Sequence, residues 1–244
     1  MDDPLPFASE TIVRLKANGH DVHYLTNNSS KSRADYVEKL SRFDIEATVE
    51  EIMTSAFAAG RLFQQREAIG KSVYVVGESG LKNELASVGM SVVEFEECPT
   101  VDYVVVGWDR SFTYKKLTSA HLAIENGAKF IATNRDATYP DANNKTLPGS
   151  GAIVAAVATC TGVDPFVIGK PETFCLNLIL ESSDYTASDT IVIGDRLDTD
   201  IYCGNAAGAR TVLTLTGVSS RSEAEAAQGH LKPDVIIDDL SQLQ

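Results

Sequence analysis

Short apolar runs that alternate with amphipathic stretches are the feature of this sequence that most constrains its fold. Several runs are rich in valine and isoleucine and lack polar alternation, as expected of strands buried on both faces. The runs lie at residues 22–25, 73–76, 103–106, 130–132, 190–193, 211–215 and 235–237. Helix-like periodicity occupies residues 7–17, 32–42, 49–64, 114–126, 151–161 and 172–181. This alternation predicts an α/β fold with a mainly parallel sheet.

The charge of the chain restricts its partners. The 244 residues carry a formal net charge of −13, which disfavours nucleic acids and anionic membranes. No apolar stretch approaches the ~18 residues of a membrane span, and the acidic opening MDDPLPFASE is unlike a signal peptide. The cysteines are widely spaced, which is typical of free thiols in a reducing compartment, and they are Cys98, Cys160, Cys175 and Cys203. We therefore expect a cytoplasmic protein with no nucleic-acid or membrane partner.

The segment GDRLDTD, residues 194–200, directly follows one of the buried-type runs. Ligands of open α/β sheets bind where the carboxyl ends of strands run into loops, so Asp195 would lie at such a place. A carboxylate there suits Mg²⁺, which prefers oxygen ligands and keeps several waters. The preceding Gly194 lets backbone and ion approach closely. For Asp198 we favour the role of a helix cap, stabilised by the helix dipole.

The segment LTNNSSKS, residues 25–32, ends another strand-like run. Thr26 offers a hydroxyl group just after the strand, and residues 27–30 would open a helix whose free N–H groups bind an anion. A phosphate group fits this description. An ordinary helix cap by Asn28, Ser29 or Ser30 would produce the same pattern, so the segment is a weak signal by itself.

The segment GKPE, residues 169–172, follows a further short apolar run. Lys170 would lie at the end of a strand, and Pro171 suits the first turn of a helix. A lysine in this position can neutralise a phosphate group or a carboxylate. A solvated surface lysine is the commoner fate of this residue type, and the pattern alone does not separate the two.

The order and spacing of the three segments carry more information than each segment alone. Together they resemble motifs two, three and four of the phosphatases of the haloacid dehalogenase superfamily. The p-nitrophenyl phosphatase and phosphoglycolate phosphatase branch of that superfamily has segments similar to TNNSSKSRADY, VVGESG, VVGWDRSFTYKKL, IATNRDATYP, LPGSGAIVAA, GKPE and GDRLDTDI. The resemblance extends from about Leu5 to the end of the chain.

The resemblance implies a Rossmann-like core with a parallel sheet, interrupted by an inserted α/β cap domain. The core would comprise residues 1–66 and 167–244, and the cap residues 67–166. The cap would close over the substrate and exclude water. The implied reaction is hydrolysis of a small phosphomonoester through an aspartyl-phosphate, with Mg²⁺ as the cofactor.

The resemblance also assigns roles to individual side chains. Lys170 would neutralise the phosphoryl group, and Asp200 would be either a ligand of Mg²⁺ or a support for one. The loop after residue 132 is the best candidate for contact with the substrate, although a turn held by its own Asn and Asp side chains explains it equally well. The assigned sets are phosphate-binding Thr26, Asn27, Asn28 and Lys170, metal-binding Asp195 and Asp200, and cap residues Asn134, Arg135 and Asp136.

The first motif of the family, Asp-x-Asp-Gly at the end of a first strand, has no counterpart in these residues. In the family its first aspartate attacks phosphorus and its second protonates the leaving group. Asp2 and Asp3 lack a preceding strand and a following glycine, so they do not qualify. A lost central strand would leave unpaired backbone groups at about 1–3 kcal/mol each. We therefore expect a longer natural protein, or a sheet that rearranges or borrows a strand.

Two functions stay open on these grounds. One is a Mg²⁺-dependent phosphatase of small metabolites, of the phosphoglycolate, p-nitrophenyl phosphate, pyridoxal phosphate or sugar phosphate type. The other is a non-catalytic module that binds a phosphorylated ligand or a protein on the same fold. A dinucleotide-binding oxidoreductase is disfavoured because VVGESG lacks the third glycine of that fingerprint. Relatives of this kind are often dimers through the cap, so a homodimer is a further expectation.

Overall fold

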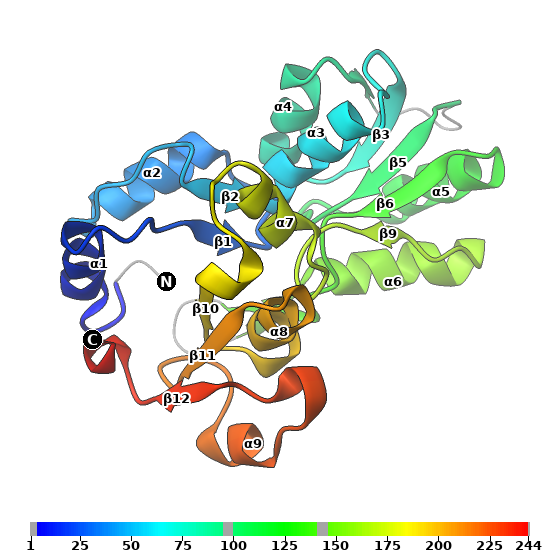
Figure 1. Ribbon diagram of the computed structural model, residues 1–244. Coiled ribbons are helices and arrows are strands. Elements are labelled where there is room, and N and C mark those ends of the chain that lie inside the picture. Colours follow the sequence, from blue (N-terminus) through cyan, green and yellow to red (C-terminus); the bar gives the residue numbers. More distant parts are fainter. Residues whose placement is uncertain (1–3, 95–99, 141–145, 244) are drawn as a thin grey trace. The chain divides into compact units, whose positions relative to one another are not determined.

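The computed structural model describes residues 4–94, 100–140 and 146–243 (Figure 1). These residues form two compact units, and the α/β fold with parallel sheets predicted from the sequence is confirmed. The first unit comprises the described residues up to Leu25, Val37–Ile52 and those from Lys170 onward. The second comprises Thr26–Tyr36 and Met53–Gly169. Residues 26–36, 53–66 and 167–169 thus pack with the unit that contains the expected cap.

A five-stranded parallel sheet forms the centre of the second unit. Its order is β4, β3, β5, β6, β9. The strands are β3 (Ser72–Val76), β4 (Ser91–Val93), β5 (Tyr103–Val106), β6 (Lys129–Ala132) and β9 (Phe166–Val167), with an antiparallel hairpin formed by β7 (Thr138–Pro140) and β8 (Thr146–Pro148). The four residues of β5 are all buried.

Helices cover both faces of this sheet, as Figure 1 shows. On one face Tyr74, Val104 and Phe130 pack with residues of α5 and α6. On the other face Tyr103 meets Phe63 of α3 edge to face, with ring centroids 4.8 Å apart. The helices are α3 (Ser55–Gln65), α4 (Ser79–Ser87), α5 (Tyr114–Glu125) and α6 (Ser150–Thr161). Burial on both faces explains why the strands read as valine runs.

The helix predicted over residues 49–64 is wrong at its beginning. Ile52–Thr54 form strand β2, which pairs with β1 (Tyr24–Thr26), and α3 begins only at Ser55. Thr54 has extended backbone angles, and its side chain accepts a hydrogen bond of 3.0 Å from the N–H of Phe57. This capping threonine separates strand from helix, a boundary that the apolar periodicity across both elements conceals.

The first unit contains a three-stranded parallel sheet in the order β10, β11, β12. Its strands are β10 (Ile191–Gly194), β11 (Arg210–Thr214) and β12 (Val235–Ile237). Its helices are α1 (Ala8–Ala17), α7 (Phe174–Glu181), α8 (Tyr202–Ala207) and α9 (Arg221–Ala226), and a single turn, η3 (Leu197–Ile201), precedes α8. The remaining helix, α2 (Arg33–Ser41), begins in the second unit and ends in the first.

The helices and the cysteines of the described residues bear on two of the sequence predictions. None of their helices has the length and apolar character that crossing a membrane requires. Cys160, Cys175 and Cys203 form no disulfide within the described residues, and Cys98 lies outside them.

Candidate active site

The loop that follows β1 is folded by its own asparagine. The side-chain oxygen of Asn28 accepts hydrogen bonds of 2.8 Å from the N–H and from the hydroxyl of Ser30. The hydroxyl oxygen of Thr26 accepts the N–H of Asn28 at 3.2 Å. The loop is therefore an Asx turn with a threonine hydroxyl at its edge.

This loop does not open a helix, so the predicted helical anion site and the alternative of a cap within residues 28–30 are both wrong. Helix α2 begins at Arg33, and Asp35 accepts hydrogen bonds of 2.8 Å from the N–H and the hydroxyl of Ser32. The Ser32–Asp35 pair organises the helix end in place of the asparagines. A phosphate group at the loop would meet the hydroxyl and N–H groups of a turn.

Tyr36 lies beside this loop and was not found by sequence reasoning. Its hydroxyl forms a hydrogen bond with Thr26, and burial raises the pKa of Tyr36 to about 12. The group is therefore protonated at neutral pH and available as a donor. A tyrosine in a helix of ordinary polarity gives no sequence signal of this contact.

The structure brings Asn27, Asn134 and Asp136 together. Asn27 is buried, and its side-chain N–H donates to Asp136 at 3.0 Å. The side-chain N–H of Asn134 donates to the carbonyl oxygen of Asn27 at 2.7 Å. The turn after β6 and the loop after β1 therefore form one hydrogen-bonded network, although 107 residues separate Asn27 from Asn134.

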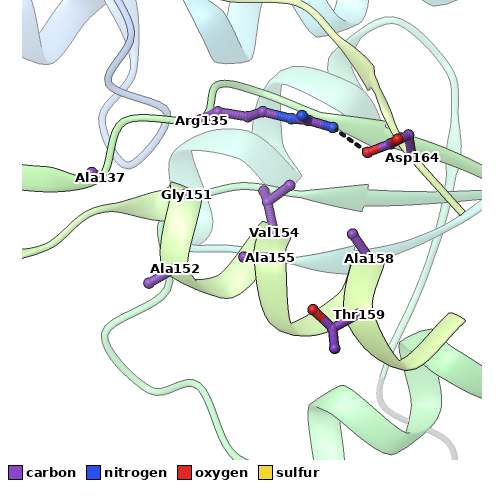
Figure 2. Close-up of a pocket in the computed structure, with 9 residues that line it drawn as sticks. All are labelled: Arg135, Ala137, Gly151, Ala152, Val154, Ala155, Ala158, Thr159 and Asp164. Atoms are coloured by element: carbon purple, nitrogen blue, oxygen red, sulfur yellow. Dashed lines mark hydrogen bonds and ion pairs between the residues drawn. The ribbon is translucent and has the colours of Figure 1, made fainter. Parts of the chain in front are cut away.

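Arg135 lines a pocket of about 510 Å³ and extends toward Asp164 (Figure 2). Its guanidinium lies 2.8 Å from the carboxylate of Asp164 across the pocket. Most of the other lining residues belong to α6 and are small, among them Gly151, Ala155 and Thr159. The pocket includes Arg135 but no residue of the loop after β1.

Lys170 belongs to the first unit and is largely buried. Its side chain is 13% exposed, and its ammonium nitrogen lies 2.6 Å from Asp200. The same nitrogen donates to the carbonyl oxygen of Leu25 at 3.2 Å. The alternative of a solvated surface lysine is thereby excluded. Pro171 does not begin a helix as expected, since α7 starts at Phe174.

Both carboxylate oxygens of Asp200 accept hydrogen bonds at the carboxyl end of β10. One carboxylate oxygen accepts Lys170, and the other accepts the N–H groups of Asp195 at 3.2 Å and Arg196 at 3.1 Å. A side chain at Gly194 would place its Cβ 2.2 Å from that of Asp200. Gly194 thus makes room for the Asp200 side chain itself, a reason that differs from the expected approach of an ion.

Asp195 is half-buried, and a backbone N–H group holds one of its oxygens. Its Oδ2 accepts the N–H of Val218 at 2.9 Å. Within the described residues, its Oδ1 receives no hydrogen bond. Asp198 is an exposed residue inside η3, 3.1 Å from Arg196, so its predicted role as helix cap is wrong.

These side chains fit a Mg²⁺ ion through a single carboxylate. No cluster of three or more potential metal-ligating side chains occurs in residues 4–94, 100–140 and 146–243. Mg²⁺ commonly takes one or two carboxylates and completes its shell with water and substrate phosphate. The free oxygen of Asp195 suits this arrangement. Asp200, with both oxygens occupied, is suited to supporting Lys170 and the Asp195 backbone.

Two family models match the chain, and together they cover both of its ends. A model described as haloacid dehalogenase-like hydrolase matches residues 1–91, and one described as HAD-hydrolase-like matches residues 167–243.

Curated relatives and solved structures match over most of the chain. An acid sugar phosphatase of Staphylococcus saprophyticus is 43% identical over 202 residues, which are 83% of this chain and 76% of the relative. A p-nitrophenyl phosphatase from Archaeoglobus fulgidus has a TM-score of 0.89 at 34% identity, over 99% of this chain and 92% of that one. A glycerol phosphate phosphatase from Mycobacterium tuberculosis was solved in complex with magnesium. It has a TM-score of 0.89 at 37% identity, over 98% of this chain and 71% of that one.

Proposed function

Because the chain belongs to the phosphatases of the haloacid dehalogenase-like hydrolase superfamily, we propose that it acts on phosphomonoesters of small metabolites with Mg²⁺. The observation that carries this proposal is the buried Lys170–Asp200 pair at the carboxyl end of β10, where Asp200 also accepts the backbone N–H of Asp195. A fixed cation and a carboxylate that can hold a metal, both supplied at the end of one strand, are the groups that phosphoryl chemistry needs.

The substrate class is proposed from the relatives. Their names include acid sugar phosphatase, p-nitrophenyl phosphatase and glycerol phosphate phosphatase. We propose sugar phosphates and other small phosphorylated metabolites, including phosphoglycolate, as substrates, with p-nitrophenyl phosphate as a convenient probe. The turn that carries Arg135 and Asp136 is the proposed cap contact with the organic part of the substrate. Homodimer formation and a cytoplasmic location stay predictions.

The proposed roles follow from the groups that each residue presents. The hydroxyl of Thr26 and the backbone N–H groups of Asn27 and Asn28 would hold the phosphoryl oxygens, and Lys170 would neutralise their charge. Asp195 would hold Mg²⁺, which, when bound, stabilises negative charge on the phosphoryl group. By resemblance, an aspartate of an Asp-x-Asp-Gly motif would accept the phosphoryl group, and the printed sequence contains no such motif.

The test is release of inorganic phosphate from a panel of sugar phosphates, phosphoglycolate and p-nitrophenyl phosphate, with Mg²⁺ and with chelator. We expect Asp195→Asn to lower kcat/KM by about 100-fold or more, because it removes a charged ligand. Asp198→Asn is the matched control and should change little, since Asp198 is exposed and its ion pair within the described residues is with Arg196. Full activity in both Asp195→Asn and Lys170→Ala would overturn the proposal.

A non-catalytic binding module is the second candidate, because the hydroxyl of Thr26 and the buried ammonium of Lys170 could bind a phosphorylated ligand without cleaving it. It predicts a rise in Tm with phosphate and Mg²⁺ together, without turnover of any substrate in the panel. At a ligand concentration of 100 Kd the stabilisation would be about 2.7 kcal/mol. Turnover that depends on Asp195 would exclude this candidate.

A further inference from the structure

Asn134 lies in the turn after β6, yet its side chain is fully occupied inside the protein. It is 3% exposed. Its side-chain nitrogen donates to the carbonyl of Asn27 at 2.7 Å and to the hydroxyl of Thr133 at 3.3 Å. Its oxygen accepts the N–H of Asp136 at 3.0 Å and the hydroxyl of Ser150. A carboxamide offers two donors and two acceptor positions, and all four are used here.

The carbonyl of Asn27 receives two donors and is thereby fixed in direction. Besides Asn134, the buried hydroxyl of Ser55 donates to it at 2.6 Å. Because a trans peptide is planar, its C=O and N–H point to opposite sides. Fixing the Asn27 carbonyl therefore directs the N–H of Asn28 the other way, where it lies 3.2 Å from the hydroxyl oxygen of Thr26.

The surroundings leave the Asn27 side chain little room to move. Its N–H group donates to Asp136 at 3.0 Å. Gly169 packs so closely that an added Cβ would lie 2.5 Å from the side-chain oxygen of Asn27 and 2.6 Å from the carbonyl oxygen of Thr133. A loop packed this tightly keeps the orientation that its buried hydrogen bonds impose.

We propose that Asn134, acting with Ser55 through the Asn27 carbonyl, is a positioning residue that presents the Thr26–Asn28 edge of the loop to a phosphoryl group. This inference rests on the proposed function only in naming phosphate as the ligand of that edge. The orientation of the peptide between Asn27 and Asn28 is a property of the ligand-free protein and can be measured separately.

The test compares three variants of the full chain. Asn134→Asp keeps the shape of the side chain but replaces the donor to Asn27 with a carboxylate oxygen. Ser55→Ala removes the other donor. The matched control is Asn205→Asp, because the Asn205 side chain likewise donates to two backbone carbonyls, those of His230 at 2.8 Å and Lys232 at 2.9 Å.

The readouts are the Asn28 amide resonance in ligand-free protein, the Kd for inorganic phosphate, and the affinity for Mg²⁺. We expect Asn134→Asp and Ser55→Ala to shift the resonance and weaken phosphate binding by about tenfold, with Mg²⁺ affinity unchanged. Asn205→Asp should leave all three at wild-type values.

A purely structural role would lower Tm without this selective loss, and an unmoved Asn28 resonance in folded Asn134→Asp and Ser55→Ala would overturn the inference. If Asn134→Asp fails to fold, Ser55→Ala alone tests the inference, because Ser55 donates to the same carbonyl of Asn27. If the wild-type protein binds no phosphate, the proposed function fails, while the Asn28 resonance still tests the positioning.

Discussion

The two parallel sheets of this protein are built from similar valine- and isoleucine-rich strands, yet the strands differ in how far their side chains are buried. All four residues of β5 are buried, and helices cover both faces of its sheet. In β10 exposed and half-buried residues alternate, and Ile191 and Ile193 are 55% and 39% exposed. Within the described residues β10 lies at the edge of its sheet. An apolar run thus indicates a strand, while its neighbours decide how much of it is buried.

Two ion pairs, one from each unit, differ in burial as well. The unit that contains β10 holds Lys170 and Asp200, which are 13% and 10% exposed. The unit that contains β5 has Lys71 and Asp102, 3.4 Å apart and 58% and 39% exposed. The Lys170–Asp200 pair is shielded from water at the end of a strand, whereas the Lys71–Asp102 pair is solvated.

Breaking the buried pair should give the largest effect. We expect Lys170→Met to lower the free energy of unfolding by about 3–5 kcal/mol, because Asp200 would be left charged and largely buried. Lys71→Met, the solvated counterpart, should cost about 1 kcal/mol or less. Urea unfolding at neutral pH measures both. Equal costs for the two variants would mean that the pairs do not differ in the way their burial indicates.

The same substitution in each sheet tests the difference in burial. Ile131→Ala in β6 removes a fully buried side chain and should cost about 2–5 kcal/mol. Ile193→Ala in β10 removes a partly exposed one and should cost about 1 kcal/mol or less. Thermal or urea unfolding would supply both values. A large cost at Ile193 would show that this side chain is covered in solution.

The smallest expected effect concerns the pH dependence of an ion pair in the second unit. Hydrogen bonds from the Arg110 guanidinium, at 2.7 Å, hold the pKa of Glu78 below its ordinary value of 4.5, against the opposing effect of burial. A lowered folded-state pKa stabilises the protein above the ordinary value, and this contribution is lost as pH falls through the folded-state value.

Glu78→Gln should therefore lower stability by about 1 kcal/mol or less at pH 7, and the difference from wild type should vanish in acid. Tm measured across pH 7 to about 3 checks the sign, taking the range from the ordinary glutamate pKa. Glu38→Gln is the control, since Glu38 pairs with Arg42 on the surface of α2 with both side chains well exposed. A difference that grows as pH falls would contradict the assignment.

Local patterns predicted the elements better than their ends. The apolar runs at 73–76, 103–106 and 130–132 correspond to β3, β5 and β6. A strand that is buried on both faces is a continuous apolar run, and such a run can be recognised in the sequence alone. The boundary between β2 and α3 was missed, because it depends on one capping threonine, Thr54. The loop after β1 was read as a helix end, because asparagine and serine serve caps and Asx turns alike.

The sequence by itself determined the α/β class, the candidate residues at the strand ends and the family. Only the tertiary structure decided which of these residues meet. Lys170 reaches Asp200 across 30 residues, and Asn134 reaches Asn27 across 107. Local periodicity reports on neighbours along the chain, whereas burial and hydrogen-bond partners arise from packing between distant segments. That is why a lysine expected at a strand end could only be recognised as buried, and Asn134 as fully bonded, once the chain was folded.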